Sequence, residues 1–176
     1  MRYRRADVAG ATYFFTVNLL DRKQTLLTDH VDTLRRCIKT VKQRYPFTID
    51  AMVILPDHLH AIWTLPENDA DFSMRWMLIK SAFSRGLPNT DNISQSRRIK
   101  RERGIWQRRY WEHLIRDELD YARHVDYIHY NPVKHGYVEH GNNWPYSSIH
   151  QFIRDGRIRP DWGFADEREA SCFGER

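Results

Sequence analysis

Two apolar, β-branched segments flank a short turn-forming cluster near the middle of the chain, and this pattern constrains the fold more than any other. The segments are Phe47–Leu55 (FTIDAMVIL) and Leu59–Leu65 (LHAIWTL), and Pro56-Asp57-His58 separates them. Runs of this composition favour strands, and a turn cluster between two strands favours a hairpin. We therefore predict two antiparallel strands, with His58 and His60 at the start of the second.

Strand-like composition recurs on both sides of this hairpin. Residues 11–20 (ATYFFTVNLL) and 105–115 are rich in β-branched and aromatic side chains, so both segments predict strands. Three other segments show the spacing of amphipathic helices and begin at residues that can cap a helix. These helices are predicted from Thr28 or Asp29 to about Tyr45, from Asp71 or Ser73 through Ser84, and from Asp117 to Asn131, where Pro132 ends the helix.

The order of these elements is strand, helix, strand, strand, helix, strand, helix. It predicts an α+β fold close to the ferredoxin-like plan, an antiparallel sheet with helices mainly on one face. At 176 residues the chain suits one compact domain, which we place at residues 1–160, followed by a polar tail at 161–176. Residues 87–104 lack periodicity and are predicted to form a loop that orders on binding a partner.

Cysteine content and hydropathy restrict the compartment. The two cysteines, Cys37 and Cys172, lie on the apolar stripe of a predicted helix and in the polar tail, so a disulfide framework is not expected. The start of the chain lacks the pattern of a secretory signal, and no apolar run has the length that spans a bilayer. We expect a cytoplasmic protein, associated with the nucleoid and not with a membrane.

Positive charge is concentrated between residues 97 and 109, where one acid, Glu102, stands among seven basic residues. Basic side chains neutralise phosphates and flat rings stack on unpaired bases, so this segment indicates single-stranded or hairpin nucleic acid. A solvated loop explains the charge alone equally well. The predicted DNA-binding residues are Arg97, Arg98, Lys100, Arg101, Arg103, Trp106, Arg108 and Arg109, together with an N-terminal arm of Arg2, Arg4 and Arg5.

The pair His58 and His60 is a candidate metal site. Residues two apart on a strand point to the same side of the sheet, so the two imidazoles can share one ion. Taken alone the pair is a weak signal, because histidines that pack or hydrogen-bond at a strand edge are more frequent. Whether the pair forms a metal site depends on which other side chains the fold brings next to the two histidines.

The third predicted helix carries Tyr127 and Asn131, which are four residues apart and therefore share a face. An amide oxygen suits a hard divalent ion, and three protein ligands leave coordination positions open for a phosphate. Tyr127 would then be a nucleophile aimed at that phosphate. Tyr121 and Tyr130 are on the same helix, but Val125 and Lys134 occupy the positions four residues after them.

Four separated motifs in this order resemble the REP-associated tyrosine transposases, relatives of the IS200-like transposases of the HUH single-tyrosine superfamily. The motifs are YFFTVNL (Tyr13–Leu19), VILPDHLHAIWTLP (Val53–Pro66), IWQRRYWEHLIRDELDY (Ile105–Tyr121) and HVDYIHYNPVKHGYV (His124–Val138). The resemblance covers most of the chain.

The resemblance implies a role for each candidate residue. His58 and His60 match metal-binding histidines, Tyr127 matches the nucleophile, and Asn131 matches the third polar ligand, one methylene shorter than the glutamine of related transposases. The implied metal is Mg²⁺ or Mn²⁺. The implied substrate is single-stranded DNA folded as a REP-type hairpin, cut and rejoined through a covalent 5′-phosphotyrosine. A monomer is expected, although insertion-sequence relatives are dimers.

Two alternatives stay open. A nucleic-acid binding module, acting as a regulator or RNA binder, would keep the fold and the basic surface without cutting; retention of His58, His60, Tyr127 and Asn131 argues against it. A metalloprotein unrelated to DNA would use Asp57 with the two histidines. We expect Asp57 instead to point away from the histidine face and to shape the turn. The acidic tail is a further candidate, as an autoinhibitory mimic of DNA phosphate.

Overall fold

The computed structural model describes residues 7–88, 95–99 and 102–163. Four strands form one antiparallel sheet in the order β2-β3-β1-β4. Their bounds are β1 Thr12–Asn18, β2 Thr48–Ile54, β3 His58–Thr64 and β4 Trp111–Leu114. This order and the positions of the intervening helices confirm the predicted α+β, ferredoxin-like sheet.

Seven helical segments accompany the sheet within the described residues. They are α1 Leu26–Asp29, α2 Val31–Arg44, α3 Phe72–Arg85, α4 Gln95–Ile99, α5 Glu118–Lys134, the 3₁₀ helix η1 Gly141–Asn143 and α6 Ile149–Arg154. Among the described residues, none of these helices combines the length and apolar character that crossing a bilayer requires.

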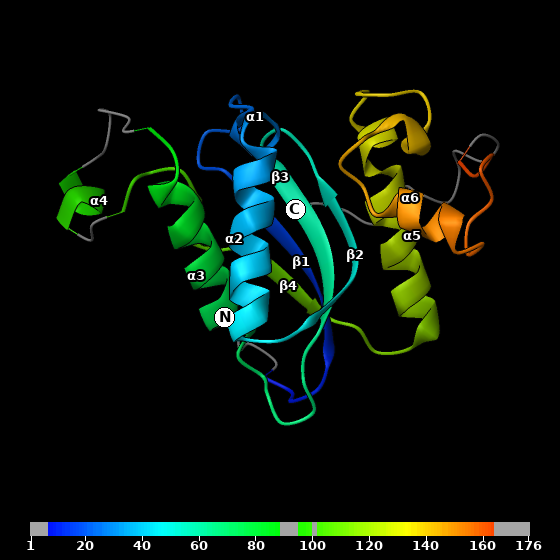
Figure 1. The fold of residues 1–176 in the computed structure, drawn as a ribbon, viewed down its shortest axis with the longest axis horizontal. Coiled ribbons are helices and arrows are strands. Elements are labelled where there is room, and N and C mark those ends of the chain that lie inside the picture. The colour runs from blue at the N-terminus through cyan, green and yellow to red at the C-terminus, as the bar shows by residue number, and fades with distance from the viewer. Residues whose placement is uncertain (1–6, 89–94, 100–101, 164–176) are drawn as a thin grey trace, which may run out of the picture.

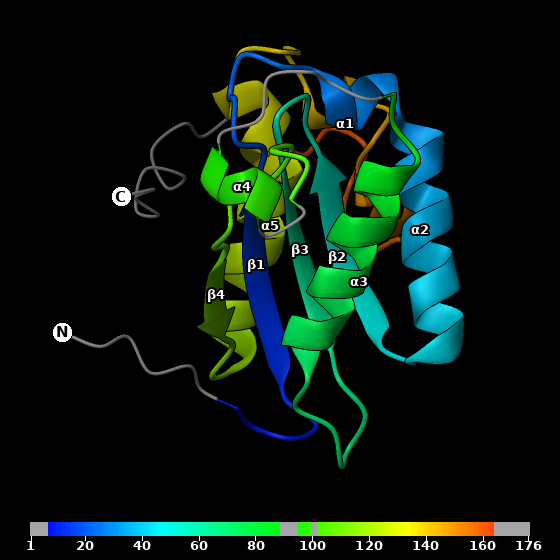
Figure 2. The same ribbon diagram turned by 90° about the vertical axis from the view of Figure 1, so that its left-hand side faces the viewer.

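The helices cover both faces of the sheet, as Figures 1 and 2 show. On one face α2 and α3 bury a core that includes Phe15, Trp63 and Trp76. On the other face α5 and α6 pack over Phe14, Val53 and neighbouring apolar residues. The prediction of helices mainly on one face is therefore corrected, because the sheet carries apolar residues on both faces, Phe15 and Trp63 on one and Phe14 and Val53 on the other, and each face needs a cover.

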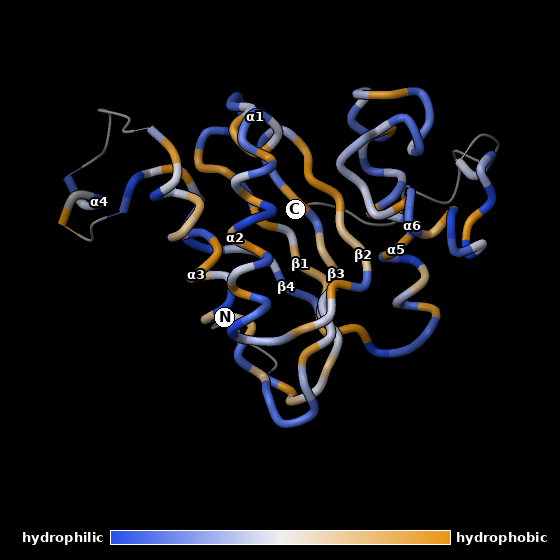
Figure 3. The backbone as a smooth tube through the Cα atoms, in the orientation of Figure 1, coloured by the Kyte–Doolittle hydropathy of each residue, from blue (hydrophilic) through white to orange (hydrophobic). Residues whose placement is uncertain are grey.

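Hydrophobic and hydrophilic residues are interspersed along α2 and α3, the helices that cover one face of the sheet (Figure 3). All residues of β3 except the last are buried, since the strand lies inside the sheet with a helical layer on each side. Helix α2 buries four apolar residues spaced along one side, Val31, Leu34, Ile38 and Val41, and leaves its basic residues outside.

Several predicted boundaries move. Thr28 and Asp29 belong to the short α1, and α2 begins only at Val31, after His30 with a non-helical backbone. The predicted strand 105–115 pairs at Trp106 through an isolated bridge and then at Trp111–Leu114. The predicted loop 87–104 contains α4.

The third predicted helix begins as expected and ends later. Asp117 caps α5 by accepting a hydrogen bond from the Asp120 amide at 2.8 Å. Pro132 does not end the helix, which runs to Lys134. A proline in the last turn removes one hydrogen bond, and the carbonyls of Asn131 and Pro132 still accept from the amides of His135 and Tyr137.

Candidate active site

The turn before β3 aims both predicted histidines at the α5 side of the sheet. In the antiparallel register His58 pairs with Asn18 and His60 pairs with Thr16. The two side chains are 1% and 0% exposed, and their ring centroids are 5.0 Å apart. The sequence prediction that His58 and His60 share one side of the strand is confirmed.

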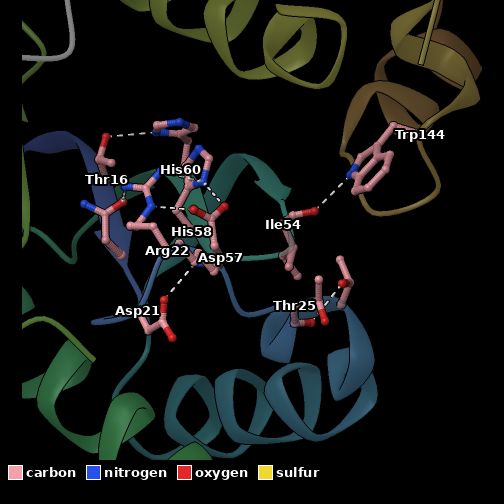
Figure 4. A network of polar contacts seen from close by, with 12 residues as sticks. Thr16, Asp21, Arg22, Thr25, Ile54, Asp57, His58, His60 and Trp144 are labelled. Carbon is pink, nitrogen blue, oxygen red and sulfur yellow. Dashed lines mark hydrogen bonds and ion pairs between the residues drawn. The ribbon is translucent and has the colours of Figure 1, made fainter. Parts of the chain in front are cut away.

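Each imidazole has a hydrogen-bond partner at its Nδ1 atom (Figure 4). The Thr16 hydroxyl lies 2.8 Å from His60 Nδ1. The Asp57 carboxylate lies 2.7 Å from His58 Nδ1 and accepts from it, because an ionised carboxylate can only accept. In both rings Nδ1 is thus engaged, and Nε2 is the nitrogen that would face a metal ion.

Asp57 corrects an expectation. Its carboxylate does not turn away from the histidines, because Oδ1 takes His58 and Oδ2 takes the Arg22 guanidinium. Arg22 also donates to Asn18 Oδ1 at 2.7 Å, which ties the end of β1 to the turn before β3. The carboxylate is thus bonded to Nδ1 of His58, which does not favour Asp57 as a direct ligand of a metal ion.

The electrostatics keep these groups in the forms that metal ligands need. Burial lowers the pKa of His60 well below its usual value, and the nearby cations Lys134 and Arg22 act in the same direction. A neutral imidazole is the metal-binding form. Burial alone would raise the pKa of Asp57, but hydrogen bonds from His58 and Arg22 hold that pKa at about 2.

Helix α5 brings Tyr127 and Asn131 to the histidines. The Tyr127 ring lies 5.1 Å from the His60 ring, centroid to centroid, and edge-on to it. Asn131 is 0% exposed, and neither atom of its side-chain amide has a hydrogen-bond partner among the described residues. A buried amide in this condition is unfavourable unless something else satisfies it.

The donor set fits a divalent cation. His58 Nε2 is also buried without a hydrogen-bond partner in the described part of the chain. Two imidazole nitrogens and an amide oxygen are a mixed N/O set suited to Mn²⁺ and related ions, and a ligand would satisfy both His58 and Asn131.

Two residues near the site were missed by sequence reasoning. Lys134 and His135 follow Tyr127 by seven and eight positions, the helical spacing that returns to one face. The Lys134 ammonium lies 4.9 Å from the Tyr127 ring centroid, and the His135 ring lies 5.1 Å from the His58 ring. Their spacing from Tyr127 was the available signal.

A second polar cluster lies beside this site, between β4 and α5. His113, Asp120 and His124 place one ligand atom each within 4.8 Å of the others. His113 Nε2 and the Arg116 amide are both bonded to Asp120 Oδ2, while His124 Nδ1 bonds the Asp120 carbonyl at 2.7 Å. These hydrogen bonds account for the cluster without an ion.

Much of the basic segment is engaged inside the protein. Arg103 donates to the carbonyls of Ser84, Leu87 and Pro88 at the end of α3. Arg97 and Arg108 both pair with Glu102. These contacts explain why a run of charge in the sequence does not become a row of unpaired cations.

The predicted stacking surface at Trp106 is also corrected. Trp106 is 6% exposed, packs edge-on against Phe83 and donates from Nε1 to the Lys80 carbonyl. No face of it is open to a base in this arrangement. Arg109 is exposed. Other predicted DNA-binding positions lie outside the described residues: Arg2, Arg4, Arg5, Lys100 and Arg101, together with the side chain of Arg98.

Comparison with known proteins now decides the family. Residues 8–131 match the family model described as "Transposase IS200 like". The chain belongs to this family. It is therefore a DNA transposase, and transposases of this HUH type generally use a divalent metal.

Relatives of this transposase share most of its length. A REP-associated tyrosine transposase of Escherichia coli (strain K12) is 48% identical over 162 residues, covering 91% of this chain and 89% of the relative. A Haemophilus influenzae protein, provisionally given the same name, is 48% identical over 162 residues, with 92% of each chain covered.

One solved structure superposes on the whole transposase. It is described as a REP-associated tyrosine transposase bound to a REP hairpin. It has a TM-score of 0.81 and 44% sequence identity, and the match covers 100% of this chain and 98% of the other. The resemblance read from the four sequence motifs is thereby confirmed.

Proposed function

We propose that this transposase nicks and rejoins single-stranded DNA beside a hairpin, with Tyr127 as nucleophile and a divalent cation held by His58, His60 and Asn131. One observation carries the proposal: the histidines of β3 and the Tyr127–Asn131 face of α5 meet in one buried place, where the Asn131 amide has no hydrogen-bond partner among the described residues. A site for binding alone has no need of this arrangement.

The substrate class is proposed from the relatives. A solved relative at 44% identity is described as bound to a REP hairpin, and the relatives at 48% identity are named for the same repeat. We propose a palindromic DNA hairpin of this type, with the cut in the single strand at its foot. The formal charge of +5 suits an anionic partner.

The reaction transfers the 5′-phosphate end of a DNA strand to Tyr127, and rejoining transfers that end from Tyr127 to a 3′ hydroxyl. Tyr127 Oη forms a bond to phosphorus, the bond to the departing 3′ oxygen breaks, that oxygen gains a proton, and the phenol proton is lost to solvent or a base. The new phosphotyrosine keeps the energy of the broken phosphodiester, so rejoining requires no nucleotide cofactor. A bound Mg²⁺ or Mn²⁺ supplies charge neutralisation at the phosphate.

The surrounding side chains hold the reacting groups in place. Thr16 and Asp57 orient the two imidazoles through their Nδ1 atoms. Phe14 packs against both the His60 ring and the Tyr127 ring, which fixes the nucleophile relative to the ligands. The Lys134 ammonium adds positive charge beside the phenol.

A covalent adduct assay tests the proposal. The protein is incubated with labelled hairpin DNA carrying a single-stranded foot, in Mg²⁺, in Mn²⁺ and in chelator, and is resolved under denaturing conditions. We expect a metal-dependent adduct in the parent and none in Tyr127→Phe. Tyr130→Phe, on the same helix, is the matched control and keeps the adduct.

Two results would change the assignment. An adduct that persists in Tyr127→Phe moves the nucleophile elsewhere. Tight binding of the hairpin with no adduct in either metal favours the non-cleaving binding module instead. The monomeric state and the cytoplasmic, nucleoid-associated location stay predictions, which sedimentation and cell imaging can check.

A further inference from the structure

An exposed tryptophan stands on the sheet at the edge of the proposed active site. Trp111 is the first residue of β4 and is 50% exposed. The register pairs Trp111 with Thr16 on β1, and Thr16 with His60 on β3. Directly paired residues lie on the same face of a sheet, and two strand spacings separate Trp111 from His60, about 10 Å.

The indole ring is held by two neighbours. Its plane is nearly parallel to that of His113, with 7° between the planes and 5.8 Å between the centroids. Phe14 meets it edge-on at 5.6 Å. The same Phe14 meets the Tyr127 ring edge-on at 5.9 Å, so the exposed indole and the proposed nucleophile lie against one phenylalanine.

A second row of contacts fixes His113 beneath the indole. His113 stacks on His124 with 4.7 Å between centroids and 18° between planes, and His124 in turn packs on Phe14. Asp120 bonds His113 Nε2 at 2.8 Å and is itself anchored by the Arg116 amide. The cluster of His113, Asp120 and His124 therefore acts as the support of an aromatic platform.

We propose that Trp111 is a stacking platform for one unpaired base of the DNA strand that enters the active site. This inference rests on the proposed function and adds a binding subsite to it. A flat ring, half exposed and already oriented, binds a nucleobase without a further loss of side-chain freedom, and such stacking tolerates any base. The position beside Phe14 places that base next to the phosphate that Tyr127 attacks.

Trp111 takes the role that the sequence suggested for Trp106. The two tryptophans are five residues apart in the same aromatic, basic segment. Trp106 is buried on the α3 side of the sheet, whereas Trp111 lies on the α5 side with the histidines. Only the second can reach a strand bound at the proposed site.

The test follows one fluorescent base at a time. Hairpins carrying 2-aminopurine at successive positions of the single-stranded foot are bound to Tyr127→Phe, which reports binding without cleavage. We expect strong quenching at one position. The quenching is lost when Trp111→Ala is added and is partly kept with Trp111→Phe, while Leu119→Ala, which removes another exposed apolar side chain, leaves it unchanged.

Affinity supplies a second readout. Trp111→Ala should weaken binding of the footed hairpin by about 10- to 100-fold. Binding of a blunt hairpin without the foot should stay the same, which also shows that the variant is folded. Because neither readout needs cleavage, failure of the adduct assay and failure of this inference are distinguishable.

Three results overturn the inference. The first is the absence of a quenched position in the foot. The second is that the Tyr127→Phe protein binds the footed hairpin with the same affinity whether or not it also carries Trp111→Ala. The third is a shift from dimer to monomer on Trp111→Ala, which would assign the exposed ring on edge strand β4 to contact with a second copy of the chain.

Discussion

At the scale of single residues, the site depends on which nitrogen each histidine offers. Asp57 and Thr16 occupy the Nδ1 atoms of His58 and His60, so both rings present Nε2 to the interior. Outer partners of this kind orient metal ligands and raise their basicity. Arg22 extends the arrangement by holding Asp57, and the low pKa of Asp57 keeps its carboxylate charged at neutral pH.

Asn131 offers a prediction in which stability and activity move in opposite directions. Its buried amide makes no hydrogen bond within the described residues, so Asn131→Leu should stabilise the metal-free protein by on the order of 1 kcal/mol. The same change should abolish the metal-dependent adduct, because a ligand oxygen is lost. Urea unfolding in chelator and the adduct assay measure the two effects.

The control for this prediction restores an oxygen without restoring the amide. Asn131→Asp should keep adduct formation in Mn²⁺ and should destabilise the metal-free protein, because a buried charge replaces a neutral group. If Asn131→Leu unfolds at lower urea than the parent in chelator, the amide has a structural partner and the ligand assignment is wrong.

At the scale of elements, α5 is the part of the fold that assembles the site. One face of this helix presents Tyr127, Asn131 and Lys134, and its cap residue His135 reaches the His58 ring. The helix packs against β2 and β3 and joins the apolar cluster on that side. A substitution that loosens the first turn of α5 should therefore lower the stability of the fold and also weaken the support that Asp120 gives to His113 beside Trp111.

The N-cap of α5 can be tested by substitution. Asp117→Ala removes the acceptor for the Asp120 amide and should lower the free energy of unfolding by about 1 kcal/mol. Asp117→Asn keeps a capping oxygen and should stay within a few tenths of a kcal/mol of the parent. Thermal and urea unfolding compare the three proteins; equal losses in both variants would mean that charge, not capping, matters at this position.

At the scale of the whole molecule, three layers bury charged groups as well as apolar ones. Lys80 on α3 lies under the segment that leads into β4 and donates to the Gln107 carbonyl at 2.7 Å. Burial lowers the pKa of Lys80 to about 8, opposed by Glu102 and aided by Arg97. This lysine links α3 to the segment before β4, although its partial burial disfavours the charged form.

The pH dependence of stability should report this burial. Between pH 8 and 10.5 the unfolded chain keeps the Lys80 proton and the folded chain loses it, so rising pH favours folding by at most about 1.4 kcal/mol per pH unit. We expect the stability of the parent relative to Lys80→Met to rise from pH 8 to 9.5 in urea unfolding. A flat difference would show that Lys80 stays charged.

Three tyrosines oppose this trend in both proteins. Burial raises the pKa of Tyr13, Tyr121 and Tyr137 above 10, so their contribution to stability is present below pH 10 and is lost as the pH rises beyond it. This loss is the same in the parent and in Lys80→Met, so it cancels in the difference between their free energies of unfolding. That difference therefore reports the titration of Lys80, whereas the stability of the parent alone does not.

Local patterns in the sequence were sufficient for several features of the fold and the site. The hairpin, the capped start of α5, the shared side of His58 and His60 and the shared face of Tyr127 and Asn131 all depend on residues a few positions apart. Strand and helix periodicity acts over that range. The four motifs that resembled the family are likewise readable in order along the chain.

Only the tertiary structure decided how these local features face one another. Trp106 and Trp111 look alike in the sequence, but Trp106 bridges Leu19, just after β1, and is buried, whereas Trp111 pairs with Thr16 of β1 and is exposed. Asp57 turns to His58 because Arg22, from the loop after β1, lies beside it. The placement of α5 on the second face of the sheet is a further feature of this kind. All of these outcomes depend on contacts between distant segments. The burial of a side chain is set by the partner that it meets in the folded protein and not by its neighbours in sequence.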